Sequence, residues 1–220
     1  MIPRVFHQIW VGGPLPDAHA EWAEAWRAMH PEWEYVLWDE DLIGLHRWKL
    51  GGLRARAPRI APRHQGQFHA DLLRLEILDR WGGVYMDTDM EPMRPLDPLL
   101  DGVEAFAAWE EEPGGRSGHG WINTAVMGCT PGHPWMRTLV DNLTEHVETL
   151  HRKRVRRPNK LSGPRYVTPL TKDRDDVTIF PKLHFYPYLY TELDRMADSF
   201  PDSYAVHHWN NRRREEGVPL

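Results

Sequence analysis

The chain has 220 residues, a formal net charge of −5 and one cysteine, Cys129. This length suits one well-buried domain, and a negative net charge gives no reason to expect nucleic acid as a partner. One cysteine forms no internal disulfide, and no apolar run approaches the roughly 20 residues that span a bilayer. We therefore expect a cytoplasmic protein with no integral membrane association.

The first part of the chain alternates predicted strands with helices, which favours an α/β fold. Hydrophobic patterning predicts a strand over 5–11, a helix from about 18 to 29 and a strand over 35–38. Trp10 stands at the end of the first strand, and ligands of open α/β sheets bind beyond the carboxyl ends of strands. Trp10 is therefore either a ligand-binding residue or one more packing residue among the 11 tryptophans.

Helical periodicity then predicts a helix over 68–81 with one broad apolar arc. Asp71 and Arg74 fall inside this arc, whereas Glu76 and Arg80 point to the opposite side. Buried charges are costly unless they are paired, so one interpretation is an ion pair between positions three apart. The other is a carboxylate and a guanidinium aimed into a cleft, where arginine suits phosphate oxygens or sugar hydroxyls.

Two aspartates, Asp87 and Asp89, end the next predicted strand. Gly82-Gly83 predicts a helix C-cap and a tight turn into this strand. Alternation places Tyr85 on the same face as both aspartates. Adjacent carboxylates repel unless a cation or a shared proton lies between them, and such oxygen ligands suit Mg²⁺ or Mn²⁺ carrying substrate phosphates. The alternative is an acidic turn after an edge strand.

The second part of the chain continues the alternation of strands and helices. It predicts extended chain at 105–109, a loop with glycines and prolines at 111–120, a strand at 123–129 and a helix at 134–150. A strongly basic run follows at 151–157, and a solvated loop is the default for such a run. The alternative is a lid that grips a diphosphate or an anionic acceptor, in which case residues 151–164 form a mobile loop.

The last predicted strand covers residues 203–209, and adjacent histidines fall on opposite faces of it. His207 shares a face with Trp209, and His208 lies on the other face, so only one histidine can face a site. A neutral imidazole is a ligand for Mn²⁺, and a structural histidine is the alternative. The 13 histidines show no spacing typical of a zinc enzyme.

These segments together resemble a known family. Asp71-x-x-Arg74 followed by Gly82-Gly83-x-Tyr85-x-Asp87-x-Asp89 resembles the core motif of DXD-type sugar transferases. That family includes yeast initiating mannosyltransferases, bacterial capsular-polysaccharide transferases and animal alpha-1,4-galactosyltransferases, and more distantly the clostridial glucosylating toxins. Further blocks agree in order, namely residues 2–12, Asn123, Gly163-Pro164 and residues 204–210. The resemblance therefore spans nearly the whole chain.

The resemblance implies an α/β fold of the GT-A type, with a mixed, mostly parallel sheet flanked by helices, in a single domain over residues 1–220. It implies a metal-dependent, retaining glycosyltransferase that moves a sugar from a UDP- or GDP-sugar to a hydroxyl acceptor on a glycan, another small molecule or a peptide. Mn²⁺ or Mg²⁺ would be held by Asp89 and His207, and indirectly by Asp87.

The resemblance also implies roles for individual residues. The expected catalytic residues are Asp71, Arg74, Asp87 and Asn123. The expected nucleotide-sugar-binding residues are Trp10, Asp71, Arg74, Tyr85, Asp87 and Trp209. Among these, Trp10 would stack on the nucleotide base, Asp71 and Arg74 would orient the sugar, Asp87 the ribose, and Asn123 would contact the anomeric region.

Three other functions are consistent with parts of the sequence. A non-catalytic nucleotide-sugar-binding protein would keep Trp10 and lose the catalytic groups. An aspartate-nucleophile phosphatase also uses Asp-x-Asp at a strand end, with Asp175 and Asp176 as metal ligands, but Glu91 stands where that motif has threonine or valine. A nucleotidyltransferase normally begins with a basic, glycine-rich phosphate loop, and residues 12–14 contain no basic residue.

Overall fold

The computed structural model describes residues 1–115, 117–210 and 213. The single domain expected over 1–220 therefore extends at its end to residues outside the described part. The larger sheet contains β1 (Val5–Ile9), β2 (Glu34–Trp38), β3 (Gly83–Met86), β5 (Ala105–Glu111), β6 (Trp121–Cys129) and β7 (Thr178–Phe180). A smaller sheet pairs β4 (Met90–Pro92) with β8 (Ala205–His207).

The strand order of the larger sheet is β2-β1-β3-β6-β5-β7. β1 pairs in parallel with β2 and β3, and β5 pairs in parallel with β7. β6 is antiparallel to both of its neighbours, β3 and β5. The predicted mixed, mostly parallel sheet is confirmed. β4 and β7 were not predicted, because each is three residues long and shows no clear alternation.

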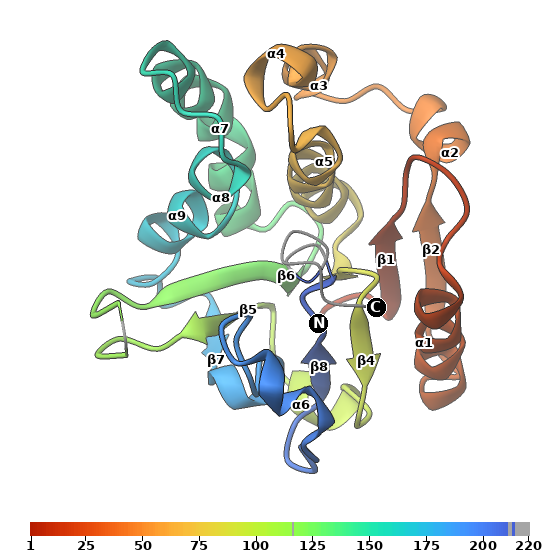
Figure 1. The fold of residues 1–220 in the computed structure, drawn as a ribbon. Helices are drawn as coiled ribbons and strands as arrows, with labels where there is room; N and C mark the ends of the chain where they lie inside the picture. Colours follow the sequence, from red (N-terminus) through yellow and green to blue (C-terminus); the bar gives the residue numbers. More distant parts are fainter. Residues whose placement is uncertain (116, 211–212, 214–220) are drawn as a thin grey trace.

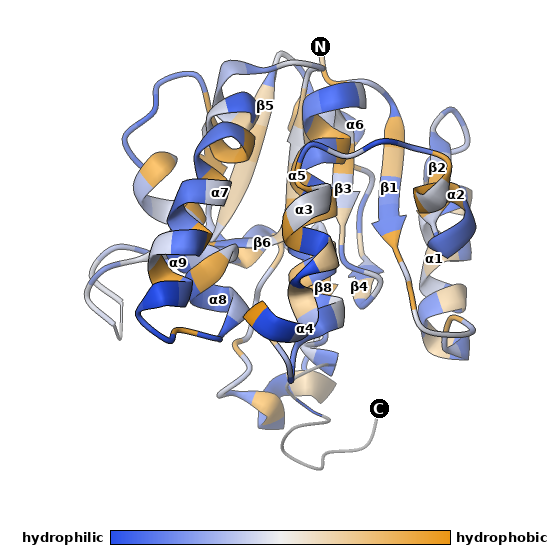
Figure 2. Ribbon diagram, turned by 90° about the horizontal axis from the view of Figure 1, so that it is seen from above, coloured by the Kyte–Doolittle hydropathy of each residue, from blue (hydrophilic) through white to orange (hydrophobic). Residues whose placement is uncertain are grey.

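The helices cover both faces of this sheet (Figure 1). They are α1 (Asp17–Met29), α2 (Glu40–Gly44), α3 (Gly51–Ala55), α4 (Ala57–Ile60), α5 (Gln65–Trp81), α6 (Asp97–Leu100), α7 (Pro134–Arg152), α8 (Pro158–Leu161) and α9 (Pro164–Val167). Short 3₁₀ turns are η1 (Thr168–Leu170), η2 (Lys182–His184) and η3 (Leu193–Ala197). Helices α3–α5 and α7–α9 lie on one face, and β4, β8 and α6 lie on the other. In Figure 2, α4, α8 and β8 all lie toward the edge to which β1 points, and Figure 1 shows α4 and α8 on the opposite face of the sheet from β8.

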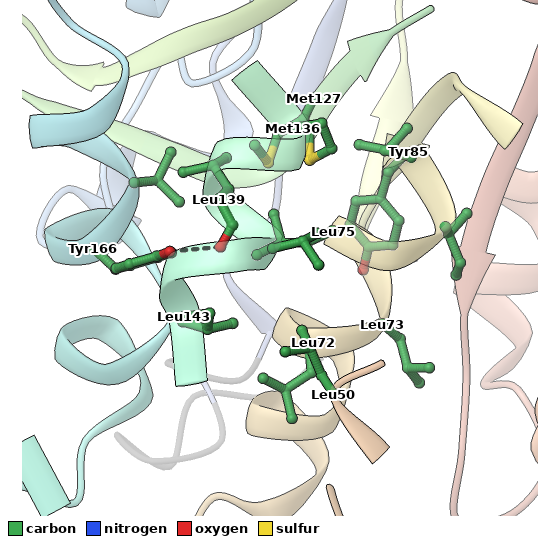
Figure 3. Close-up of a cluster of buried hydrophobic side chains, with 14 of the residues drawn as sticks. Leu50, Leu72, Leu73, Leu75, Tyr85, Met127, Met136, Leu139, Leu143 and Tyr166 are labelled. Atoms are coloured by element: carbon green, nitrogen blue, oxygen red, sulfur yellow. Dashed lines mark hydrogen bonds between the residues drawn. The ribbon is translucent and has the colours of Figure 1, made fainter. Parts of the chain in front are cut away.

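The centre of the helical layer is α5. Figure 3 shows Leu72 and Leu75 of α5 in one cluster of buried side chains with Leu139 and Leu143 of α7. The hydroxyl of Tyr166 donates a hydrogen bond to the carbonyl oxygen of Leu139 and so ties α9 to α7. These helices hold the inward-facing charges of α5 in place.

The prediction that α5 keeps one polar face is wrong at Glu76. This side chain is buried, and it accepts hydrogen bonds from the backbone N–H groups of Lys49 and Leu50, just before α3. The reason is that α3 and α7 both pack on α5, so the middle of the helix has no solvent face. A buried carboxylate there satisfies the orphan N–H groups of a neighbouring helix start.

The predicted turn at Gly82-Gly83 is confirmed. Both glycines have positive φ, 63° for Gly82 and 86° for Gly83. A Cβ atom on Gly82 would lie 2.6 Å from the carbonyl oxygen of Cys129, and one on Gly83 would lie 2.7 Å from that of Val5. Only glycine therefore allows β3 to enter the sheet between β1 and β6 immediately after α5.

The predicted mobile loop, 151–164, begins in the last turn of α7. Its C-terminal half is packed, because Pro158 and Leu161 of α8 are buried and Ser162 is 1% exposed. Arg152, Lys153 and Arg154 are exposed. Lid motion stays a prediction, and the packing limits it to the basic run. Among the described residues, no helix combines the length and apolarity that a membrane span requires.

His7 on β1 is a buried histidine whose protonation the fold opposes. Trp38 Nε1 donates to His7 Nδ1 at 3.1 Å, and His7 Nε2 lies 3.1 Å from the carbonyl oxygen of Gly82. Nδ1 can accept only when it carries no proton, so this arrangement requires the neutral ring. Burial lowers the pKa of His7 from 6.5 to about 4, against the Gly82 hydrogen bond, which raises it.

We expect His7 to contribute to acid denaturation. Because its pKa in the folded protein is depressed, its contribution is full above the unfolded pKa of 6.5 and is lost as the pH falls toward about 4. The shift corresponds to about 3 kcal/mol in the free energy of unfolding. Urea unfolding between pH 7 and pH 4 measures this loss, and His7→Gln should flatten the curve in that window. Equal pH slopes for both proteins would contradict the assignment.

Candidate active site

The aspartate pair lies in the turn that joins β3 to β4. The strand ends at Met86 rather than at Asp89, although the N–H of Asp87 still donates to the carbonyl oxygen of Ala125 at 2.7 Å, the partner that continues the register between β3 and β6. Gln8 Nε2 donates to the carbonyl oxygen of Asp87 at 3.3 Å. The backbone of Asp87 is therefore held by β1 and β6, while its carboxylate stays partly exposed.

Three predicted metal ligands meet at this turn. Ligand atoms of Asp87, Asp89 and His207 all lie within 4.8 Å of one another. His207 Nε2 is 3.2 Å from Asp89 Oδ1, and both side chains are buried. His207 Nδ1 is buried without a hydrogen-bond partner among the described residues, so Nε2 is the nitrogen directed at the carboxylates. Two carboxylates and one imidazole fit Mn²⁺.

Asp89 and His207 set each other's charge state. Burial by itself raises the pKa of Asp89, but the nearby His207 and the N–H of Asn210 outweigh it and hold this pKa below its usual range. Burial lowers the pKa of His207, and the charge of Asp89 outweighs it and raises that pKa. The Asp89 carboxylate is therefore ionised at neutral pH.

The Asp71–Arg74 ion pair lies directly beside the aspartate turn. Arg74 Nη2 is 3.2 Å from Asp71 Oδ1, and Nη1 is 3.2 Å from Asp87 Oδ1. Nη1 also donates to the carbonyl oxygen of Thr124, which lies where β6 shifts register against β5. The ion-pair interpretation is confirmed, and the pair also holds a predicted metal ligand. Its contact with phosphate oxygens or sugar hydroxyls stays a prediction.

Two hydroxyl groups complete this arrangement. Tyr85 OH donates to Asp87 Oδ1 at 2.7 Å, and the Arg74 guanidinium lies 4.5 Å from the centre of the Tyr85 ring. Ser162 Oγ donates to Asp71 Oδ2 at 2.7 Å. Burial raises the pKa of Asp71 to about 6, although Arg74 and Ser162 lower it. Ser162 was not predicted, although it stands next to the Gly163-Pro164 block.

Asn123 on β6 is buried near the same turn, and both ends of its amide are engaged. Its Nδ2 donates to Glu110 Oε2 at 2.7 Å, and its Oδ1 accepts from the N–H of Ala125 at 2.8 Å. The sequence analysis did not identify Glu110, because alternation along β5 does not indicate where its side chain points.

Trp10 contacts the aspartate turn through His19. Trp10 is half-buried at the end of β1, and its Nε1 donates to the carbonyl oxygens of Gly13 and Pro14. Its ring meets the ring of His19 edge-on at 5.4 Å, and His19 Nδ1 is 2.9 Å from Thr88 Oγ1. Trp10 is thus linked to the aspartate turn through a histidine that the sequence did not single out.

Trp209 lies outside the strand predicted for it, and its ring packs against His207, one of the three predicted metal ligands. β8 ends at His207, and Trp209 has a left-handed backbone with φ 55°. Its ring lies 4.2 Å from the ring of His207, and its Nε1 donates to the carbonyl oxygen of Tyr188. This bend brings the N–H of Asn210 to Asp89 Oδ2 at 2.8 Å. The buried indole supports His207, whereas Trp10 is the more exposed aromatic residue.

The two adjacent histidines should respond differently to substitution. His208 faces away from the cluster, with Nε2 2.7 Å from Glu91 Oε2 and its ring stacked on Trp22 at 4.6 Å. We expect His207→Ala to weaken Mn²⁺ binding roughly 10–100-fold in the presence of UDP or GDP. His208→Ala should lower thermal stability and leave Mn²⁺ affinity near the wild-type value. Calorimetric titration compares the two, and the opposite ranking would overturn this assignment.

Sequence comparison relates this chain to known glycosyltransferases. Residues 16–105 match the family described as "Glycosyltransferase sugar-binding region containing DXD motif". Inositol phosphoceramide mannosyltransferase 3 of Schizosaccharomyces pombe is 30% identical over 158 residues, which cover 68% of this chain and 39% of that protein. Human alpha-1,4-N-acetylglucosaminyltransferase is 28% identical over 170 residues, which cover 70% of this chain and 46% of that protein. The chain thus spans less than half the length of these relatives.

Solved structures show the same fold at low sequence identity. PaToxG glycosyltransferase superimposes with a TM-score of 0.57 at 15% identity, over 99% of this chain and 79% of that one. The catalytic domain of alpha-toxin from Clostridium novyi gives 0.55 at 9% identity, over 100% and 80%. The galactosyltransferase LgtC, solved with donor and acceptor sugar analogues, gives 0.53 at 14% identity, over 93% and 87%. The expected GT-A fold is confirmed.

Proposed function

We propose that this protein is a metal-dependent, retaining glycosyltransferase, because residues 16–105 match the family described as a glycosyltransferase sugar-binding region containing a DXD motif. Its donor is a UDP- or GDP-sugar, and its acceptor is a hydroxyl group of a glycan, another small molecule or a peptide. The observation that carries the proposal is the cluster of Asp87, Asp89 and His207 at the edge where β1 and β3 end.

The cluster supplies the ligands for Mn²⁺, and Mg²⁺ is the alternative ion. A bound divalent cation would offset the negative charge that develops on the departing diphosphate. Asp89 and His207 are buried, whereas Asp87 is partly exposed and is contacted by the hydroxyl of Tyr85 and the guanidinium of Arg74. These partners orient the Asp87 carboxylate before the donor binds, so that less order has to be created on binding.

The remaining residues place the donor around this cluster. Trp10 offers an aromatic surface for the nucleotide base, for which stacking contributes on the order of 1–3 kcal/mol if values for single-stranded nucleic acids apply. Arg74 acts mainly by holding Asp71 and Asp87, because its guanidinium is buried and bonded to both. Asn123 lies on β6, the strand that pairs with β3, and its amide would meet the anomeric region of the sugar.

Nucleotide release from a donor panel tests this proposal. Matched relatives are named as a mannosyltransferase and an N-acetylglucosaminyltransferase, so the panel includes GDP-mannose and UDP-N-acetylglucosamine besides UDP-glucose and UDP-galactose. At least one donor should release its nucleotide with Mn²⁺ and stop doing so when EDTA is added. The anomeric configuration of the transferred sugar, followed by NMR, then tests retention.

The same assay separates the alternative functions. A non-catalytic nucleotide-sugar-binding protein would bind a donor with Mn²⁺ and release no nucleotide. A phosphatase would release inorganic phosphate from p-nitrophenyl phosphate. Either result would overturn the proposed transferase.

A further inference from the structure

Glu110 is the residue of β5 that the sheet directs toward the aspartate turn. Trp109 lies opposite Ile122 in the ladder with β6, and Glu111 lies opposite Trp121, so Glu110 is the extra residue of a β-bulge. Bulges bend a strand and re-aim the inserted side chain, and they recur beside active sites. The position of this carboxylate is therefore a property of the sheet rather than of an exposed loop.

The neighbouring amide fixes the carboxylate in place. Glu110 Oε2 accepts a hydrogen bond from Asn123 Nδ2 at 2.7 Å, and Asn123 is itself held through its Oδ1 by the N–H of Ala125. The Glu110 side chain is half-buried. A carboxylate that is oriented in advance and partly dehydrated acts on nearby charge more strongly than one in bulk water.

The charge of Glu110 reaches the predicted metal site. Burial raises the pKa of Tyr186 well above its usual value, and the charges of Asp87 and then Glu110 raise it further. At His207, burial lowers the pKa, while Asp89, Asp87 and Glu110 raise it. Glu110 thus approaches the site from β5, while Asp71 and Arg74 approach it from α5.

This placement suits the sugar end of a donor. If the predicted metal ligands hold the diphosphate and Asn123 meets the anomeric region, as proposed above, the donor sugar lies next to Glu110, which contacts Asn123. Positive charge develops on the anomeric carbon and ring oxygen as the glycosidic bond breaks. We propose that the carboxylate of Glu110 faces the donor sugar and stabilises this positive charge. The inference deepens the proposed transferase function and rests on it.

The first test uses Glu110→Gln, which keeps the shape and the hydrogen bond from Asn123 and removes the charge. Turnover of whichever panel donor the wild type uses should fall roughly 10²–10³-fold, as when other groups that stabilise developing charge are removed. Calorimetric affinity for UDP or GDP with Mn²⁺ and the thermal midpoint should stay at wild-type values. Glu111→Gln is the matched control, because Glu111 caps the N–H of Ser117 instead.

A second test distinguishes direct action from orientation of Asn123. Sodium formate should restore part of the turnover of Glu110→Ala, and sodium chloride at the same ionic strength should not. In the Asn123→Ala background, Glu110→Gln should still lower turnover substantially, whereas a residue acting only through Asn123 would have no further effect there. Failure of both results would reduce Glu110 to a positioning residue.

The outcomes separate this inference from the proposed function. If the wild type releases nucleotide and Glu110→Gln retains more than half of that turnover, only the role of Glu110 is overturned. The role of Glu110 is also overturned if Glu110→Gln lowers the affinity for the nucleotide as much as it lowers turnover. If the wild type releases no nucleotide from any donor, the proposed function fails, and the role of Glu110 fails with it.

Discussion

Asp89→Asn is expected to reduce nucleotide-sugar turnover roughly 10²–10³-fold and to abolish Mn²⁺-dependent donor binding. Asp89 Oδ1 faces His207 Nε2 at 3.2 Å, and Oδ2 accepts the N–H of Asn210 at 2.8 Å. Asparagine keeps the shape of the side chain but removes its charge. It also replaces one carboxylate oxygen by an NH₂ group, which then faces either His207 Nε2 or the N–H of Asn210. Nucleotide release and calorimetric titration with Mn²⁺ measure the two effects.

The control for this variant lies in another Asp-x-Asp sequence of the same chain. The Asp173 side chain is 83% exposed and lies 3.9 Å from the exposed Lys172. Asp173→Asn should therefore leave turnover and Mn²⁺ binding unchanged. If Asp89→Asn kept near-normal turnover in Mn²⁺, residues 87–89 would be a structural turn and the predicted metal site would be wrong.

Arg74→Met is expected to lower the free energy of unfolding by about 3–5 kcal/mol, the usual cost of removing one partner of a buried ion pair. Only 3% of the Asp71 side chain is exposed, so the variant leaves its carboxylate with Ser162 as its remaining hydrogen-bonding partner among the described residues. The Asp87 carboxylate loses a partner as well. Turnover should fall together with stability, and urea unfolding and nucleotide release measure the two losses.

The pH dependence of the stability of Arg74→Met tests whether the unpaired Asp71 carboxylate causes the loss. Burial already raises the pKa of Asp71 from 3.8 to about 6 in the folded protein, although Arg74 lowers it. Without Arg74 the folded pKa rises further. A carboxyl group whose pKa is raised by folding contributes to stability at low pH, and this contribution is lost as the pH rises through the pKa of the folded state. The stability gap between variant and wild type should therefore be small near pH 4 and widen above about pH 6.

A double variant provides the matched control. Asp71→Asn removes the buried charge and keeps an oxygen for Ser162. Asp71→Asn with Arg74→Met should therefore be more stable than the sum of the single changes predicts, because the coupling of contacting charges is lost once. Additive losses would show that Arg74 stabilises the fold through Asp87 and Thr124 and not through Asp71.

Much of the scaffold was predictable because its signals are local. The strand cores of β1, β2 and β6, the long helices α1, α5 and α7, and the turn at Gly82-Gly83 all lie where the sequence places them. The strands predicted at 5–11 and 203–209, and the strand predicted to end at Asp89, are each too long. The alternation in the sequence continues past the observed strand ends, Ile9, Met86 and His207, and alternation by itself does not show where a ladder of paired strands stops.

The aspartate turn, the Asp71–Arg74 pair and His207 were all predicted from the sequence. Local spacing singled out the two aspartates and the Asp71–Arg74 pair, and the resemblance to DXD-type sugar transferases singled out His207. Tertiary structure alone decided which groups meet them. Glu110 and Asn123 meet through a bulge, Ser162 reaches Asp71 across 91 residues, and Asn210 joins His19 across 191. Such contacts leave no periodic signal, since they depend on how strands and helices pack after each has formed.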